Sequence, residues 1–138
     1  MKILLDTNVW VSALIWGGQM SPFLQLAESG LITLITSEPI LAELSQVLQY
    51  EKLQAKIRSL RTTPQELMEL AQNLSELHPT VEISVPELRD RVIVLATAAA
   101  GNVDTIVTGD RDLLVLGEFL GVPIVSPRDF FSRYFNDG

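Results

Sequence analysis

The sequence predicts a single α/β domain of 138 residues, with helices on both faces of a central parallel sheet. Short apolar runs, typical of strands that are buried on both faces, alternate with longer segments that carry apolar residues at helical spacing. The length fits one domain, and no linker, internal repeat or low-complexity segment divides it. We therefore expect residues 1–138 to form one three-layer α/β/α unit with four to five strands.

Five short segments have the composition of strands. Four of them are apolar and end in polar or turn-forming residues, whereas the fifth alternates apolar and polar residues, as a strand nearer an edge does. The predicted strands are residues 2–5, 31–36, 81–85, 105–107 and 122–125. Ligands of parallel α/β sheets bind outside the carboxyl ends of the strands, so the residues that follow each strand are candidates for chemistry.

Apolar stripes at helical spacing, together with start and stop residues, predict seven helices. Ser21-Pro22 and Ser126-Pro127 are typical helix starts, as is Ser37 before Pro39, because serine caps the first turn and proline suits it. Gly101-Asn102 is typical of a left-handed helix end. The predicted helices span residues 9–15, 22–30, 38–48, 51–60, 63–78, 88–100 and 127–135.

The amino-acid composition limits the classes of function that the protein can have. The formal net charge is −7, whereas nucleic-acid-binding proteins usually carry a basic face. The charge fits either an ordinary acidic protein or a cluster of carboxylates that binds a divalent cation. Cysteine is absent, which excludes disulfides, thiolate nucleophiles and zinc–sulfur sites. No export signal or membrane-length apolar stretch is present, so we expect a cytoplasmic protein with no membrane partner.

Carboxylates recur at predicted strand ends and helix starts: Asp6, Glu43, Asp90, Asp110 and Asp112. Each acid alone is as well explained as a helix cap. Two of them, however, close separate buried strands, and a parallel sheet would bring these two to the same edge. Two carboxylates about 5 Å apart repel by roughly 3 kcal/mol at an effective dielectric of about 20. Mg²⁺ or Mn²⁺, which prefer oxygen ligands, would relieve that repulsion.

Four segments in this order resemble the PIN-domain ribonucleases, and among them the VapC-like toxins of toxin–antitoxin pairs. They are Leu-Asp-Thr-Asn-Val at residues 5–9, Glu43, Asp-Arg-Val-Ile-Val-Leu-Ala at residues 90–96, and Ile-Val-Thr-Gly-Asp-Arg-Asp-Leu-Leu at residues 106–114. The resemblance covers nearly the whole chain, including Ser126-Pro127 before the last helix. It implies cleavage of single-stranded RNA with Mg²⁺ or Mn²⁺, a homodimer, and an antitoxin protein as partner.

The resemblance also implies roles for individual residues. The four acids that match the family's catalytic quartet are Asp6, Glu43, Asp90 and Asp110. Asp6, Asp90 and Asp110 would be metal ligands, and Glu43 would be a ligand or would orient the attacking water. Asn8 and Thr108 match supporting polar positions, and Asp112 matches an acid that many members have. The number of metal ions, one or two, stays open.

One departure from the family pattern concerns the third acid. Many relatives have an Asp-Pro pair just before it, whereas here Pro86 lies four residues before Asp90. Glu87 lies in between and is the alternative to Asp90, either as its substitute or as its assistant.

Cations and aromatic residues offer possible contacts to RNA. Arg91 and Arg111 flank the proposed acids, and Lys52 and Lys56 belong to the densest basic segment. An ordinary solvated helix face is the competing explanation for the two lysines. The tryptophans at positions 10 and 16 could stack on bases. Their place in a short apolar helix favours contacts in the core or with another subunit instead.

Two other functional classes compete with the ribonuclease hypothesis. A PIN-like scaffold or regulatory module without catalysis would lack one of the acids, and all four are present. Haloacid dehalogenase-like phosphatases also place an aspartate after the first buried strand, but they have a second one two residues later, where this chain has Asn8. A nuclease that processes ribosomal RNA remains compatible, whereas the small size argues against a DNA-flap nuclease. The RNA target stays open.

Overall fold

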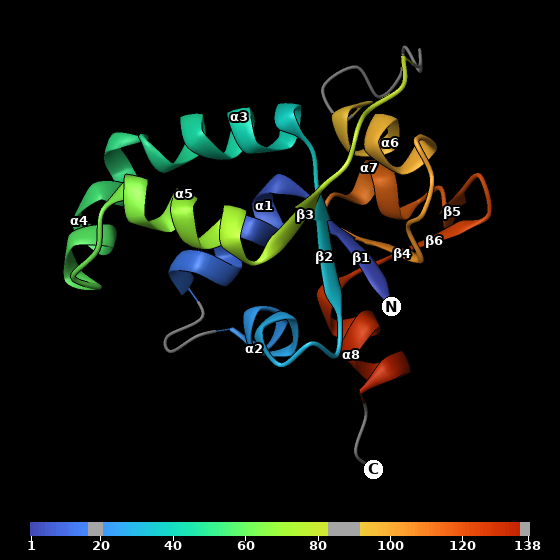
Figure 1. Ribbon diagram of the computed structural model, residues 1–138, viewed down its shortest axis with the longest axis horizontal. Helices are drawn as coiled ribbons and strands as arrows, with labels where there is room; N and C mark the ends of the chain where they lie inside the picture. The colour runs from blue at the N-terminus through green and yellow to red at the C-terminus, as the bar shows by residue number, and fades with distance from the viewer. Residues whose placement is uncertain (17–20, 83–91, 136–138) are drawn as a thin grey trace.

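A central sheet with flanking helices confirms the expected α/β/α class in the computed structural model, which describes residues 1–16, 21–82 and 92–135 (Figure 1). The strand order is β3-β2-β1-β4-β6-β5. The strands are β1 (Lys2–Leu5), β2 (Thr33–Thr36), β3 (Ser75–Leu77), β4 (Thr105–Val107), β5 (Glu118–Phe119) and β6 (Val122–Val125). The first five in this order are parallel, and only the two-residue β5 is antiparallel. The described sheet therefore has five parallel strands, as expected, and one short additional strand.

Strand β1 lies in the middle of the sheet because its apolar run can be buried on both faces. It pairs in parallel with β2 on one side, where Ile3 is the partner of Leu34. On the other side it pairs in parallel with β4, where Leu5 is the partner of Val107. Residues 3–5 are fully buried. This register fixes which residues meet at the carboxyl edge of the sheet.

Helices α2, α3 and α8 begin where their serine and proline signals predict. Ser21 Oγ accepts a hydrogen bond from the Leu24 amide, and Ser126 Oγ accepts one from the Asp129 amide. Gly101 and Asn102 both have positive φ angles, as expected for a left-handed helix end. The helices are α1 (Thr7–Val11), the π-helix η1 (Ser12–Trp16), α2 (Pro22–Glu28), α3 (Glu38–Leu48), α4 (Glu51–Ser59), α5 (Pro64–Asn73), α6 (Val92–Ala99), α7 (Arg111–Leu114) and α8 (Pro127–Tyr134). None of the helices in the described residues is long and apolar enough to span a membrane.

Ser37 stands at the start of α3 as expected, but its side chain does not cap the helix. Its Oγ lies 2.8 Å from Thr97 Oγ1 on α6 instead. Both side chains are fully buried, so this hydrogen bond ties α3 to α6 across the sheet edge.

The helix predicted over residues 63–78 is confirmed over residues 64–73 and wrong beyond them. The strand predicted over residues 81–85 is wrong at residues 81–82, the part of it that the structure describes. Helix α5 ends at Asn73, and the next residues form β3, in which Ser75 is the partner of Leu34 on β2. Ser75 Oγ donates to the Ala71 carbonyl at 2.7 Å and closes the helix. For residues 75–77, pairing with the edge of β2 is more favourable than continuing the helix. Residues 81–82 lie in no strand, whereas residues 83–85 and the first part of the predicted 88–100 helix fall outside the described residues.

Candidate active site

The carboxyl ends of β1 and β4 bring two sequence-distant polar segments together. Asp6 follows β1 and Thr108 follows β4, and the two strands are parallel neighbours. The Asp6 amide donates to the Val107 carbonyl at 3.0 Å, which extends the pairing by one step beyond β1. This is the edge at which the parallel-sheet argument expected the acids to meet.

Asp6 occupies the first position before α1, where an aspartate usually caps the helix, yet its side chain makes no capping hydrogen bond. Its Oδ2 instead accepts a hydrogen bond from Thr108 Oγ1 at 2.7 Å. The side chain is half-buried. Helix capping, the competing structural explanation for this residue, therefore does not account for Asp6.

Thr108 connects Asp6 to the segment that follows β4. Its side chain is fully buried, and its hydroxyl also accepts a hydrogen bond from the Asp110 amide at 3.0 Å. A hydroxyl has only one proton to donate, and Thr108 gives it to the Asp6 carboxylate. The two hydrogen bonds together fix Asp6 relative to the turn that carries Asp110.

Asp110, in contrast, does act as a helix cap. Its Oδ1 accepts a hydrogen bond from the Asp112 amide at 2.8 Å, at the start of the short helix α7. Arg111 and Asp112 are exposed on that first turn. Capping fixes the orientation of the Asp110 side chain, and it does not exclude a second role for a carboxylate, which has about four lone-pair positions.

Glu43 approaches the same edge from α3, which packs against α1. Its side chain is half-buried. Burial raises the pKa of Asp6, whereas hydrogen bonds from the Thr108 hydroxyl and the Thr7 amide lower it. The negative charges of Glu43 and Asp110 raise that pKa further. The charges of both other carboxylates therefore reach Asp6.

Several expected site residues are not brought into this group. Asp90, Glu87 and Arg91 fall outside the described residues. Asn8 is exposed on the first turn of α1, and among the described residues its side chain makes no hydrogen bond to the acids.

The donor chemistry of the edge fits a hard divalent cation. Asp6, Glu43 and Asp110 offer only oxygen atoms, and the repulsion between their charges is what such an ion offsets. Within residues 1–16, 21–82 and 92–135, however, no three acidic or histidine side chains lie close enough together to enclose an ion. Asp90, the remaining acid of the expected quartet, lies outside these residues.

Asn8 lines two grooves, and no feature of the sequence predicted either of them. One has a volume of about 300 Å³ and mainly apolar walls, with Val9 from α1, Phe23 from α2 and Phe131 from α8. The other has a volume of about 470 Å³ and is lined by Trp16 of η1 and by residues of α3 and α4, among others. Trp10 is fully buried, as the core explanation predicted, but Trp16 is 58% exposed and does not follow it.

Comparison with known families decides the assignment. The model of the PIN domain family matches residues 2–112. The chain belongs to the PIN domain family. The match includes the three described acids and the residues that follow β1 and β4. It also sets aside the haloacid dehalogenase-like alternative.

A solved structure shares the PIN fold of this chain. It is the crystal structure of VapBC2 from Rickettsia felis bound to a DNA fragment from their promoter. The match has a TM-score of 0.57 and 18% identity, and it covers 91% of this chain and 98% of the other. At this identity the likeness concerns the fold. No curated protein sequence matches the chain.

Proposed function

We propose that this PIN domain is a Mg²⁺- or Mn²⁺-dependent endoribonuclease that cleaves single-stranded RNA, and that it is the toxin of a toxin–antitoxin pair. The observation that carries the proposal is the environment of Asp6. Its carboxylate is half-buried, receives the proton of the buried Thr108 hydroxyl, faces the charges of Glu43 and Asp110, and caps no helix. An ionisable side chain that is held half-buried beside other negative charges is typical of a functional site.

Asp6 and Asp110 would hold the metal ion directly or through water, together with Asp90. When bound, the ion would lower the pKa of a water molecule and offset the charge that grows on the phosphate. Glu43 would complete the ligand set or accept a hydrogen bond from the attacking water. Thr108 would keep the Asp6 carboxylate in one orientation, because its hydroxyl is committed to that hydrogen bond.

Cations near the acids would hold the substrate. Arg111 is exposed directly after Asp110 and would contact a phosphate of the substrate. Arg91 follows Asp90 in the sequence and has the same proposed role. Lys52 and Lys56 lie on α4, beside the groove that begins at Asn8. Asn8 and Asp112 would support the site through polar contacts to substrate or water.

The proposed antitoxin partner, homodimer and cytoplasmic location rest on family membership and on the fold likeness to VapBC2. The partner is tested by co-expressing this chain with the protein encoded by a neighbouring reading frame and looking for a complex by size-exclusion chromatography. The same measurement on the isolated chain gives its own oligomeric state.

The catalytic part of the proposal is tested by cleavage of a single-stranded RNA with Mg²⁺, Mn²⁺ or EDTA. We expect cleavage only with a divalent ion, and Asp6→Asn should reduce it by a factor on the order of 10²–10³. Asp104→Asn is the matched control, because Asp104 is exposed at the opposite end of β4. Wild-type protein that binds metal but cuts no RNA would favour the inactive-scaffold hypothesis.

A further inference from the structure

The groove of about 470 Å³ begins at Asn8, two residues after Asp6. One wall is η1 with Trp16, and the other is the corner between α3 and α4, with Val47, Tyr50 and Lys52. We call it the tryptophan–tyrosine groove. Its volume lies in the range of small-ligand sites, and it adjoins the carboxyl edge of the sheet. A chain that passes the acids can therefore continue into it.

The groove exposes two large aromatic rings. Trp16 is 58% exposed and Tyr50 is 49% exposed, whereas Trp10, from the neighbouring helix α1, is fully buried. Aromatic side chains contribute most to stability when buried, so two exposed rings in one groove are unusual in a chain with an extensive core. Rings of this kind are the platforms on which unpaired bases stack.

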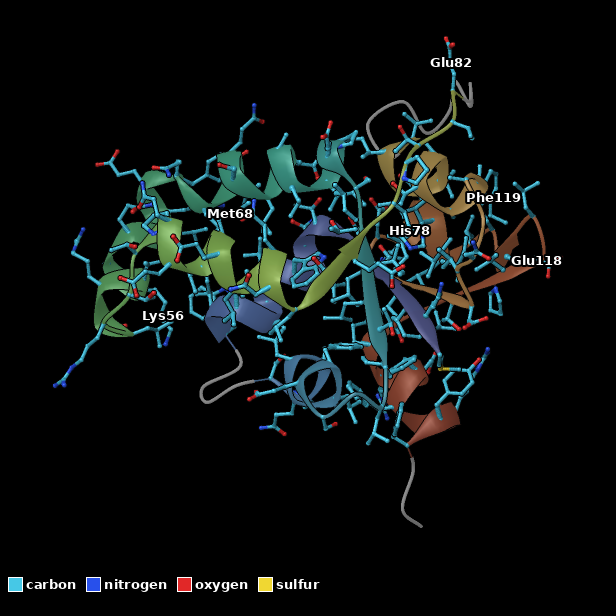
Figure 2. The ribbon with its side chains drawn as sticks, in the orientation of Figure 1. Lys56, Met68, His78, Glu82, Glu118 and Phe119 are labelled. Atoms are coloured by element: carbon cyan, nitrogen blue, oxygen red, sulfur yellow. The ribbon has the colours of Figure 1, made fainter. Side chains whose placement is uncertain are left out.

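Each ring has a lysine ammonium over it. Lys56 Nζ lies 5.3 Å from the centre of the Trp16 ring, and Lys52 Nζ lies 5.9 Å from the centre of the Tyr50 ring. Figure 2 shows Lys56 on α4 beside the blue helical segment that carries Trp16. Cation and ring are thus paired twice along the groove. A polymer with alternating flat bases and phosphates matches this repeat.

The charge of the groove also differs from that of the whole chain. Acidic residues outnumber basic ones by 17 to 10, yet among the described residues the groove lining includes Lys52 and no carboxylate. Local positive charge on an acidic protein favours an anionic occupant over an apolar protein segment.

We propose that the tryptophan–tyrosine groove is a substrate subsite that binds unpaired RNA bases beside the cleavage position, with Trp16 and Tyr50 stacking on bases and Lys52 and Lys56 contacting phosphates. This inference rests on the proposed ribonuclease function. Stacking requires bases whose faces are free, so the groove selects single-stranded over double-stranded RNA.

Binding without cleavage tests the groove separately from catalysis. The measurement is the fluorescence anisotropy of a labelled single-stranded RNA in EDTA, compared with an abasic oligonucleotide of the same length. Trp16→Leu and Tyr50→Leu should each weaken binding of the base-bearing RNA by about 10-fold, since stacking contributes about 1–3 kcal/mol per base. Binding of the abasic strand should not change. Trp16→Phe should restore most of the affinity, because it keeps a ring.

The lysines should behave differently from the rings. Lys52→Gln and Lys56→Gln should weaken binding of both strands and reduce its dependence on salt. Arg58→Gln is the matched control: it removes the same charge from the exposed surface of the same helix and should change affinity by less than about 2-fold. Unchanged melting temperatures would show that these substitutions leave the fold intact.

Equal binding of base-bearing RNA by wild type, Trp16→Leu and Tyr50→Leu would overturn the inference, and the groove would then be a candidate site for a protein segment. Equal weakening of both strands by the ring variants would overturn it too, because stacking cannot act on an abasic strand. These outcomes differ from a failure of the proposed function. A wild type that binds through the rings but cuts no RNA contradicts catalysis alone, and one that cuts RNA independently of the rings contradicts the groove alone.

Discussion

Two aspartates stand at opposite ends of the β1–β4 strand pair, and their surroundings differ. Asp104 precedes β4 and is exposed, and its Oδ2 accepts a hydrogen bond from the Lys2 amide at 2.7 Å. Asp6 follows β1 and is half-buried among other carboxylates. The first aspartate satisfies a backbone amide at little electrostatic cost. The second is held beside other negative charges, and ionisable groups in such surroundings are typical of sites with a chemical role.

The threonines at the two ends of β4 show the same contrast. Thr108 and Thr105 are both fully buried. Thr108 makes two hydrogen bonds, to the Asp6 carboxylate and from the Asp110 amide. Thr105 Oγ1 has no hydrogen-bond partner within the described part of the chain. Along β4, the side-chain hydrogen bonds are therefore made at the carboxyl end of the strand.

Removing the Thr108 hydroxyl should have the largest effect among the substitutions that leave the acids intact. Thr108→Val removes the hydroxyl that donates to the Asp6 carboxylate and leaves the Asp110 amide without its acceptor, at a cost of about 1–3 kcal/mol. Cleavage and metal affinity should fall by about 10- to 100-fold, as for other residues that orient a ligand. Urea unfolding and a cleavage assay measure both. Thr108→Ser keeps the hydroxyl and should recover most of the loss; if it does not, the hydrogen bonds are not the cause.

The raised pKa of Asp6 predicts a smaller, pH-dependent effect in the metal-free protein. Because the folded state favours protonated Asp6, the free energy of unfolding falls as the pH rises from the ordinary value of 3.8 through the folded pKa. Asp6→Asn removes this loss, so in EDTA at pH 7 the variant should be more stable than wild type. The difference should vanish as the pH falls below about 4. A difference independent of pH would show that ionisation of Asp6 is not responsible.

The smallest effect is expected at the other end of β4. Thr105→Val replaces a hydroxyl that has no partner in the described structure with a methyl group of similar size. We expect a stability change of about 1 kcal/mol or less, neutral or stabilising, and unchanged cleavage. A loss as large as that of Thr108→Val would remove the contrast between the two ends of the strand.

The sequence predicted which residues meet at the carboxyl edge of β1 and β4, because the ends of both strands are marked by local changes from apolar to polar residues. The apolar run of β1 ends abruptly at Asp6, that of β4 ends before Thr108, and two parallel neighbours must place these residues together. The structure adds what no spacing rule contains: Asp110 caps a helix and Asp6 does not.

The errors have equally physical causes. Residues 75–77 form a strand because an edge of β2 is available to them, and that edge is distant in the sequence. Trp16 ends the π-helix over residues 12–16 and is exposed, so it does not join the core as Trp10 does. A contact of Trp16 with another subunit, the alternative that the sequence left open, stays a prediction. The third acid, Asp90 or Glu87, stays a prediction because both residues lie outside the described structure.

The most direct test of the metal site is thermal unfolding of wild type, Asp6→Asn and Asp104→Asn with and without Mn²⁺. At a Mn²⁺ concentration near 100 Kd, wild type and Asp104→Asn should each gain about 2.7 kcal/mol of stability. Asp6→Asn should lose most of that gain. An equal response of all three proteins, or no response in wild type, would contradict the account, since Asp6 would then be no more a metal ligand than Asp104.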